Sequence, residues 1–213
     1  MDGDSLKQDS KAFFGWLASQ YDNEGVYEMC KDDYPDILAE LEREPVQDVL
    51  DCGCGTGAVL TLLHAAHPEM RLTGIDLADE MIGVAQSRGL EQVTFIVGDC
   101  ENLPFDDCSF DAIICSHSFH HYPHPQRFFG AAARILRPGG RLIIRDNTGP
   151  TLWLLKKNLY TIPKGNRKSH MGDVKFYSRR EVAAFCQTAG LSMELFEERG
   201  NHKMHCVARR PLQ

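Results

Sequence analysis

Apolar positions along the chain follow two alternating patterns. Short apolar or β-branched runs of about 4–8 residues are typical of strands, and longer segments with one apolar face are typical of helices. The strand-like runs in the first two thirds of the chain are residues 46–51, 71–76, 93–97, 110–116 and 141–145. The helix-like segments are residues 11–20, 34–43, 58–66, 79–88, 126–136 and 179–189.

The order of these segments predicts the fold class. Strands alternate with helices, which indicates βαβ units and an α/β, doubly wound, mostly parallel sheet. Residues 191–197 and 204–209 predict two further strands around a Gly200-Asn201 turn, and such a hairpin adds antiparallel strands at a sheet edge. We therefore expect a single domain with seven strands. Its expected parts are an N-terminal helical cap (1–44), a ligand-binding core (45–147), a lid-like insertion (148–178), and a C-terminal helix with the hairpin (179–213).

Composition limits the class of protein further. With 43% hydrophobic and 25% charged residues, the 213-residue chain is typical of one soluble globular domain. The polar, acidic start MDGDSLKQDS does not resemble a signal peptide, and no apolar run approaches the length of a membrane span, so we expect a cytoplasmic protein without membrane attachment. Its eight cysteines are then expected to be reduced, small and mostly buried. The net charge of -7 argues against broad nucleic-acid binding.

The stretch VLDCGCGTG, residues 49–57, predicts a ligand site directly after the first strand. Gly53 and Gly55 allow a tight turn and close approach to a ligand, and Asp76 ends the next strand where a carboxylate can accept hydrogen bonds from ribose hydroxyls. Asp51 decides between ligands. A carboxylate at this position would repel a pyrophosphate but favours the ammonium and sulfonium of S-adenosylmethionine. The site therefore indicates S-adenosylmethionine rather than NAD.

A series of further motifs resembles one family. VLDCGCGTG, GIDLADEMI, VGDCENLPF, FDAIICSHSFHHYPHP and LRPGGRLIIRD are similar, in this order, to the motifs of class I S-adenosylmethionine-dependent methyltransferases. Within that class the chain most resembles the ubiquinone and menaquinone biosynthesis branch and other small-molecule methyltransferases. The resemblance implies a Rossmann-like fold, S-adenosylmethionine as cofactor and methyl transfer as the reaction.

The resemblance also implies roles for individual residues. Aspartates at 76 and 99 could instead cap the segments that follow them, and Met81 and Tyr21 could be core residues. The residues expected to bind the cofactor are Tyr21, Asp51, Gly53, Cys54, Gly55, Thr56, Asp76, Leu77, Met81, Asp99, Cys100 and Ser116.

The stretch HSFHHYPH is the candidate catalytic segment. Histidine titrates near neutral pH and suits general-base work, so His117, His120 and His121 are the candidate catalytic residues, and Tyr122 is a candidate acceptor ligand. The alternative is that these histidines only pack or orient neighbours. A metal site from His120 and His124, with or without His117, is not expected, because no cysteine or acid falls in register. We therefore expect no bound metal.

The insertion at 148–178 is basic. Folded over the site, Arg167, Lys168 and His170 could hold an anionic acceptor, or the charges could simply be solvated. Its basic residues are Lys156, Lys157, Lys164, Arg167, Lys168 and Lys175, with Asp173 as its single acid.

Together these features predict an enzyme that methylates a small anionic or aromatic molecule, as a monomer or homodimer. An RNA or protein methyltransferase is the second hypothesis, although the acidic chain and the absence of an N/D-P-P-Y/F stretch disfavour RNA. The third hypothesis is a non-catalytic, cofactor-binding regulator, and the fourth is an NAD-linked dehydrogenase.

Overall fold

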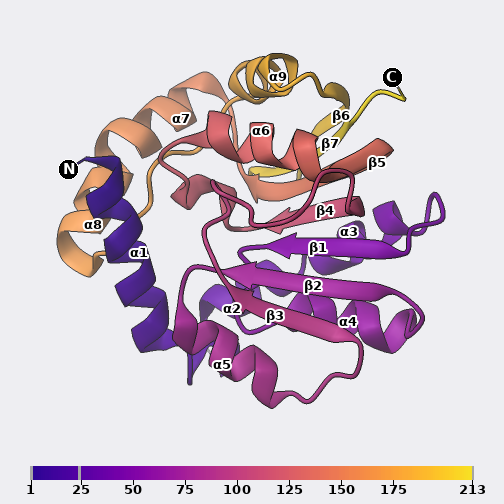
Figure 1. Ribbon diagram of the computed structural model, residues 1–213. Coiled ribbons are helices and arrows are strands. Elements are labelled where there is room, and N and C mark those ends of the chain that lie inside the picture. The colour runs from indigo at the N-terminus through magenta and orange to yellow at the C-terminus, as the bar shows by residue number, and fades with distance from the viewer. Residues whose placement is uncertain (1, 24, 213) are drawn as a thin grey trace.

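The computed structural model describes residues 2–23 and 25–212, and within them it contains one seven-stranded sheet (Figure 1). The strand order is β3-β2-β1-β4-β5-β7-β6. Neighbours from β3 to β5 pair in parallel, whereas β7 is antiparallel to both β5 and β6, as the pattern predicts. The strands are β1 (Asp48–Cys52), β2 (Arg71–Asp76), β3 (Val93–Val97), β4 (Phe110–Ser116), β5 (Leu136–Asn147), β6 (Ser192–Arg199) and β7 (Lys203–Arg209).

Helices follow most strands, and others precede the sheet or form the insertion. The N-terminal helix starts earlier than predicted, because Asp2 caps it by accepting a hydrogen bond from the Ser5 amide at 2.8 Å. The helices are α1 (Gly3–Leu17), α2 (Gly25–Lys31), α3 (Tyr34–Leu41), α4 (Ala58–Ala66), α5 (Asp79–Ser87), α6 (Pro125–Ile135), α7 (Thr151–Lys156), a π-helical turn (Lys157–Thr161), α8 (Ile162–Ser169) and α9 (Arg179–Thr188).

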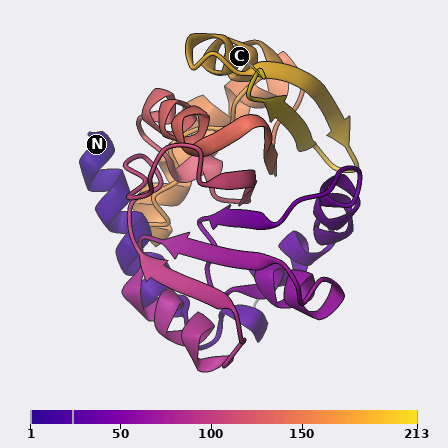
Figure 2. The ribbon, with the colours of Figure 1, turned by 45° about the vertical axis from the view of Figure 1, so that its right-hand side comes forward.

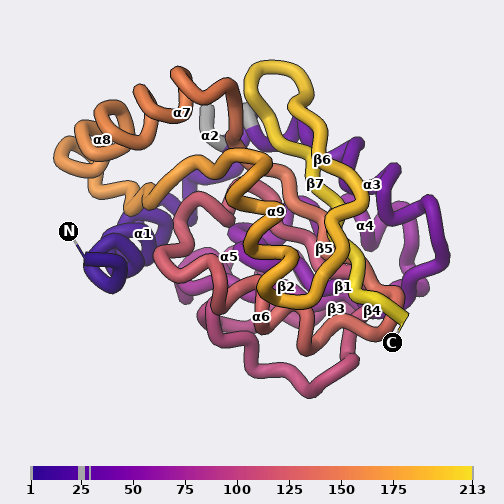
Figure 3. Tube along the Cα trace, turned by 90° about the horizontal axis from the view of Figure 1, so that it is seen from above, coloured from indigo at the N-terminus to yellow at the C-terminus, as the bar shows by residue number. Residues whose placement is uncertain are grey.

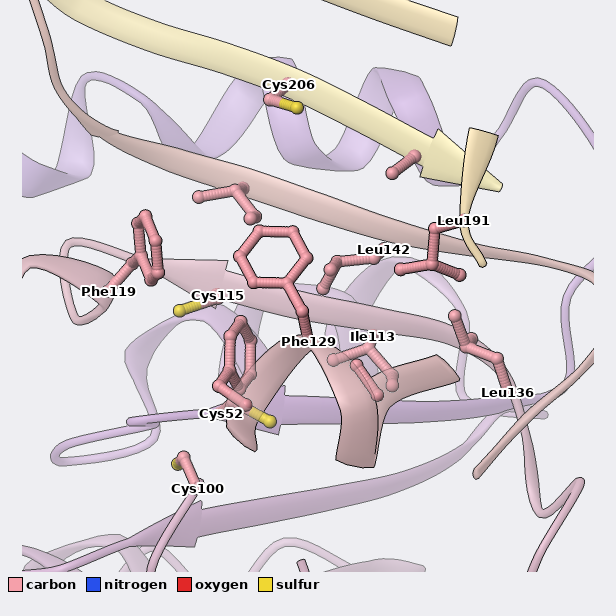
Figure 4. Packing of buried hydrophobic residues seen from close by; sticks show 14 of the residues in the cluster. Cys52, Cys100, Ile113, Cys115, Phe119, Phe129, Leu136, Leu142, Leu191 and Cys206 are labelled. Carbon is pink, nitrogen blue, oxygen red and sulfur yellow. The ribbon is translucent and has the colours of Figure 1, made fainter. Parts of the chain in front are cut away.

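Two apolar cores lie on opposite faces of the sheet. Successive strand residues point to opposite faces, so Leu142 and Ile144 join the core beneath α6 and α9, whereas Ile143 joins the core beneath α3, α4 and α5. Figure 4 shows the first core, in which Phe119 and Phe129 pack over β4. Both faces are therefore buried, as expected of a doubly wound sheet.

The N-terminal helix and the insertion cover the carboxyl ends of the parallel strands. In all three ribbon and tube views α1 and α8 lie beside one another (Figures 1, 2 and 3), and the arrows of β1 and β2 in Figure 1 point toward them. The segment that follows α8 also packs closely against α1: a Cβ atom added to Gly172 would lie 2.4 Å from the Leu6 carbonyl oxygen. This edge is where open α/β sheets bind ligands.

The cysteines agree with the expectation of reduced thiols. All eight are free, seven are buried, and Cys108 alone is exposed. Figure 4 shows Cys52, Cys100 and Cys115 within the core near the carboxyl ends of the strands. Among the described residues, no helix is both long and apolar enough to cross a bilayer.

Candidate active site

The glycine turn after β1 has a backbone that requires glycine. Gly53 and Gly55 have φ values of 74° and 52°, in the left-handed region. The amides of Gly53 and Cys54 both donate to the Ile75 carbonyl, at 2.8 and 3.1 Å. A Cβ atom on Gly53 would lie 1.9 Å from Ser118 Oγ, so even alanine would not fit without a shift of the β4–α6 loop.

Asp76 closes this turn from β2. Its Oδ2 accepts a hydrogen bond from the Gly55 amide at 2.9 Å, and its Oδ1 accepts one from the Ala78 amide at 2.9 Å. Burial raises the pKa of Asp76, and these amide donors counter part of that rise. The carboxylate is thus fixed at the carboxyl end of the strand, where the sequence predicts it.

Asp51 is a buried carboxyl group that lacks a partner. It is 1% exposed, and its Oδ1 accepts no hydrogen bond from the described part of the chain. Burial, with a smaller contribution from Asp76, raises the pKa of Asp51 to about 7. Ser116 Oγ lines the same hollow and is also buried without a partner. Unpaired buried polar atoms are costly, so their position indicates a ligand that supplies a positive charge and hydrogen bonds.

Two adjoining cavities surround the glycine turn. The larger has about 680 Å³ of empty space and the smaller about 350 Å³, including space open to solvent. The residues that line both are Tyr21, Gly53, Gly55, Ser116 and His117. Every residue expected to bind the cofactor lines one or the other. Asp76, Leu77, Met81, Asp99 and Cys100 line the larger cavity, and Asp51, Cys54 and Thr56 line the smaller one.

Helix α1 contributes residues that sequence motifs did not indicate. Lys7, Ser10 and Phe14 line the larger cavity. Lys7 Nζ contacts Asp99 Oδ2 at 2.8 Å and also pairs with the buried Glu101. These positions lie three or four residues apart, about one helical turn, which indicates that they share a helix face. The spacing does not distinguish the wall of a cavity from ordinary core packing.

His117 lines both cavities and is held by a carboxylate. Its Nε2 lies 2.6 Å from Asp33 Oδ2, and Asp33 also pairs with Arg145. Burial lowers the pKa of His117, and the hydrogen bond to Asp33 offsets only part of this, so the imidazole is neutral at pH 7. Asp33 directly precedes α3 and makes no side-chain capping bond to that helix; it lies far from His117 in sequence, and no motif predicted the pair.

The two neighbouring histidines occupy different environments. His121 lines the larger cavity, and burial, followed by the charge of His120, lowers its pKa to about 4. His120 lines neither cavity. Its Nδ1 lies 2.7 Å from Asp146 Oδ1; burial alone would lower the pKa of His120, but Asp146 outweighs it and raises that pKa. The structure therefore brings two of the three candidate catalytic histidines to the cavity.

Of the residues expected to bind the methyl acceptor, one lines the larger cavity and three do not. Tyr122 lines the larger cavity, and its hydroxyl lies 2.8 Å from Ser118 Oγ. Arg167 and Lys168 are exposed on α8, and His170 lies in a shallow groove on the outer side of α1, so none of the three lines the cavities. Their contact with an acceptor therefore stays a prediction, which the lining of these two cavities does not support.

Comparisons with known proteins show the family to which the chain belongs. The family described as "Methyltransferase domain" matches residues 50–144. Demethylmenaquinone methyltransferase of Thermotoga maritima is 31% identical over 165 residues, a match that covers 75% of this chain and 70% of the relative. The chain belongs to the class I S-adenosylmethionine-dependent methyltransferases.

Other relatives of this methyltransferase differ in name. Malonyl-[acyl-carrier protein] O-methyltransferase of Hahella chejuensis is 32% identical over 163 residues, covering 75% of this chain but 56% of the relative. Among solved structures, a putative methyltransferase in complex with the Haloferax volcanii Trm112 activator superposes with a TM-score of 0.74 at 22% identity, covering 93% of this chain and 97% of that one. At that identity the likeness shows the fold alone.

The residues of the methyltransferase fit its cofactor, S-adenosylmethionine. The unpartnered Asp51 carboxylate and Ser116 hydroxyl suit the ammonium group of the methionine moiety. Asp76 suits the ribose hydroxyls, and Leu77 and Met81 offer apolar surface to the adenine. These three sets of residues thus suit the ammonium, the ribose and the adenine of one ligand.

Proposed function

We propose that this methyltransferase acts on a small aromatic acceptor. The observation that supports the proposal is the wall of the larger cavity, where rings gather from two separate parts of the chain. Phe14 and Tyr21 come from the N-terminal segment, and His117, His121 and Tyr122 come from the loop after β4. Flat π-surfaces of this kind favour stacking and edge contacts with a planar ring.

The charges around the cavity favour an aromatic acceptor over a strongly anionic one. Lys7, the lysine in its wall, already pairs with Asp99 and Glu101. The basic residues of the insertion at 148–178 are not among the residues that line this cavity. The relatives' names do not choose between acceptor classes, because one is named for demethylmenaquinone and another for an acyl-carrier-protein ester.

The chemistry divides between cofactor and protein. S-adenosylmethionine, when bound, supplies a methyl group on a sulfonium, whose sulfur keeps the electron pair as the methyl carbon bonds to the acceptor. The protein holds the acceptor in line, and much of its contribution is positioning. Where the acceptor is a hydroxyl or thiol, neutral His117, oriented by Asp33, accepts the proton that leaves.

The test is a screen with methyl-labelled S-adenosylmethionine. Phenols, aromatic amines and thiols are offered beside simple carboxylic acids, total RNA and a protein lysate, and label transfer is measured. We expect transfer to aromatic small molecules. His117→Asn should then lower kcat by roughly 100-fold or more with a phenolic acceptor, because the base is lost.

The remaining outcomes contradict the proposal in distinct ways. Label found only in RNA or protein would favour the macromolecular hypothesis. Cofactor binding with no transfer to any acceptor class would favour a non-catalytic, cofactor-binding regulator. Arg167→Ala, on the exposed face of α8, is the matched control and should transfer label to phenols at the wild-type rate.

A further inference from the structure

A cluster of three metal-ligating side chains lies behind the cavity wall. It consists of His120, His121 and Asp173, and one donor atom from each lies within 4.8 Å of the other two. Asp173 Oδ1 is 3.5 Å from His121 Nδ1 and 3.7 Å from His120 Nε2. Around a bound first-row ion, donors about 2.0–2.2 Å from the metal lie roughly 3.0–3.4 Å from one another. The distances from the Asp173 oxygen to the two histidine nitrogens therefore exceed the donor–donor separation of a metal site by only a few tenths of an ångström.

Two of the three donor atoms are buried and lack hydrogen-bond partners within the described residues. His121 Nδ1 and Asp173 Oδ1 both have none within the described residues, although they face each other. A buried histidine nitrogen and carboxylate oxygen without partners are costly in an empty site. A metal ion between them would satisfy both at once.

The surroundings hold the three donors in place as they do in metal sites. His120 Nδ1 and the His120 amide both bond to the Asp146 carboxylate, at 2.7 and 3.0 Å, which leaves Nε2 as the free ring nitrogen. A carboxylate behind a ligating histidine is the usual outer-shell arrangement. Phe176 packs edge-on against the His120 ring at 5.5 Å, and Phe14 packs edge-on against His121 at 5.1 Å.

Asp173 is also fixed from outside the cluster. The buried Asn166 side chain donates to the Asp173 carbonyl at 2.6 Å and accepts from its amide at 3.1 Å. The amides of Val174 and Lys175 donate to the His120 carbonyl, at 2.8 and 3.2 Å. The insertion is thus tied by its backbone to the histidine pair, and its single acid is the residue that faces them.

We propose that His120, His121 and Asp173 form a binding site for a divalent first-row transition metal ion, with Asp146 as the outer-shell partner of His120. Two imidazoles and one carboxylate suit Zn²⁺, Fe²⁺ or Mn²⁺ and leave coordination positions open. Because His121 lines the larger cavity, the ion lies at the cavity wall. An acceptor oxygen or sulfur held there would lose its proton more readily, and neutral His117 in the same cavity would accept that proton. This role rests on the proposed function, whereas the metal site itself does not.

Metal titration of chelator-treated protein tests the site. Cobalt(II) is the optical probe and Zn²⁺ the calorimetric one. We expect one ion per chain with micromolar affinity or tighter. Asp173→Asn keeps the shape of the side chain and should weaken binding at least tenfold. Asp146→Asn should weaken it about 10–100-fold through the outer shell. His67→Gln, at the far end of α4, is the matched control and should bind as wild type does.

S-adenosylmethionine titrations of the same samples separate the two proposals. Asp173 lines neither cavity, so the Asp173→Asn variant should still bind the cofactor, which also shows that it is folded. Wild type that binds the cofactor but no metal, or metal binding that survives both aspartate substitutions, would overturn the metal site and leave the methyl-transfer proposal standing. Metal binding without label transfer to any acceptor would overturn the methyl-transfer proposal and leave the metal site standing.

Discussion

At the scale of single residues, Asp51 shows a conflict between stability and binding. Its native pKa of about 7 lies above the ordinary aspartate value, so the native carboxyl keeps a proton that the unfolded chain loses as pH rises. The native state therefore loses relative stability between about pH 4 and pH 7, and above pH 7 it contains a buried carboxylate without a partner. Such a residue is retained for its ligand and not for the fold.

Asp51→Asn should therefore stabilise the cofactor-free protein at alkaline pH. The gain in free energy of unfolding should grow with pH toward an upper limit of about 4 kcal/mol above pH 7. Urea unfolding at pH 5.5 and pH 8.5 measures it, with the exposed Asp107→Asn as control for loss of one charge. A variant that is less stable than wild type at pH 8.5 would show that the carboxylate has a favourable partner in the empty protein.

The same carboxyl group predicts how cofactor affinity depends on pH. Only ionised Asp51 attracts an ammonium, so the Kd for S-adenosylmethionine should rise as pH falls below about 7, approaching tenfold per unit. Calorimetry between pH 5.5 and pH 8 gives this slope. Asp51→Asn should bind weakly at every pH with a flat profile; a flat profile in wild type would place the ammonium elsewhere.

At the scale of elements, the hydrophobic pattern predicts the bounds of a helix or strand best where that segment is a short apolar run that packs into the core. Residues 58–66, 71–76, 93–97 and 110–116 have the predicted bounds, because each is a short apolar run between turn residues. The insertion was predicted only as a basic lid-like segment. Its α7, π-helical turn and α8 have no uniform apolar face, since they bury only Leu154, Ile162 and Asn166.

Within this insertion, the Asn166 side chain on α8 bonds to the backbone of Asp173, and this contact can be tested. Asn166→Ala removes two hydrogen bonds to the Asp173 backbone and leaves buried groups unpaired, which should lower stability by about 1–3 kcal/mol. Amide hydrogen exchange across residues 170–177 should become faster, while that of β1 and β4 stays slow. Lys168→Ala, exposed on α8, should leave that exchange unchanged. Equal protection in both variants would show that other contacts hold the segment.

At the scale of the whole molecule, the place of the cavity was predictable, and the residues that reach it from other parts of the chain were not. The residues expected to bind the cofactor follow strand ends, and strand ends meet at one edge of a parallel sheet. Asp33 and Asp173 reach the histidines from the N-terminal helices and the insertion, through contacts that no local spacing encodes. The histidine spacing alone therefore could not indicate the approach of Asp173 to His120 and His121, and the basic composition of the insertion could not show which of its residues line the cavity.

Cofactor binding should stabilise the whole chain by mass action. S-adenosylmethionine at about 100 times its Kd adds roughly 2.7 kcal/mol to the free energy of unfolding. For a domain of this size that corresponds to a rise in Tm of about 5–10 °C. Thermal unfolding with and without cofactor measures it, and S-adenosylhomocysteine should act similarly. An unchanged Tm at saturating cofactor would contradict binding to the native state.

The most direct test of the account is calorimetric titration of the purified protein with S-adenosylmethionine and S-adenosylhomocysteine, with NAD as the control ligand. The account predicts micromolar binding of both sulfur compounds. Asp51 is expected to attract the ammonium of either compound, Asp76 to accept hydrogen bonds from its ribose, and the glycine turn to let the protein backbone approach it closely. It predicts no binding of NAD, whose pyrophosphate the Asp51 carboxylate repels. Binding of NAD, or of neither sulfur compound, would contradict the assignment of these residues to the cofactor.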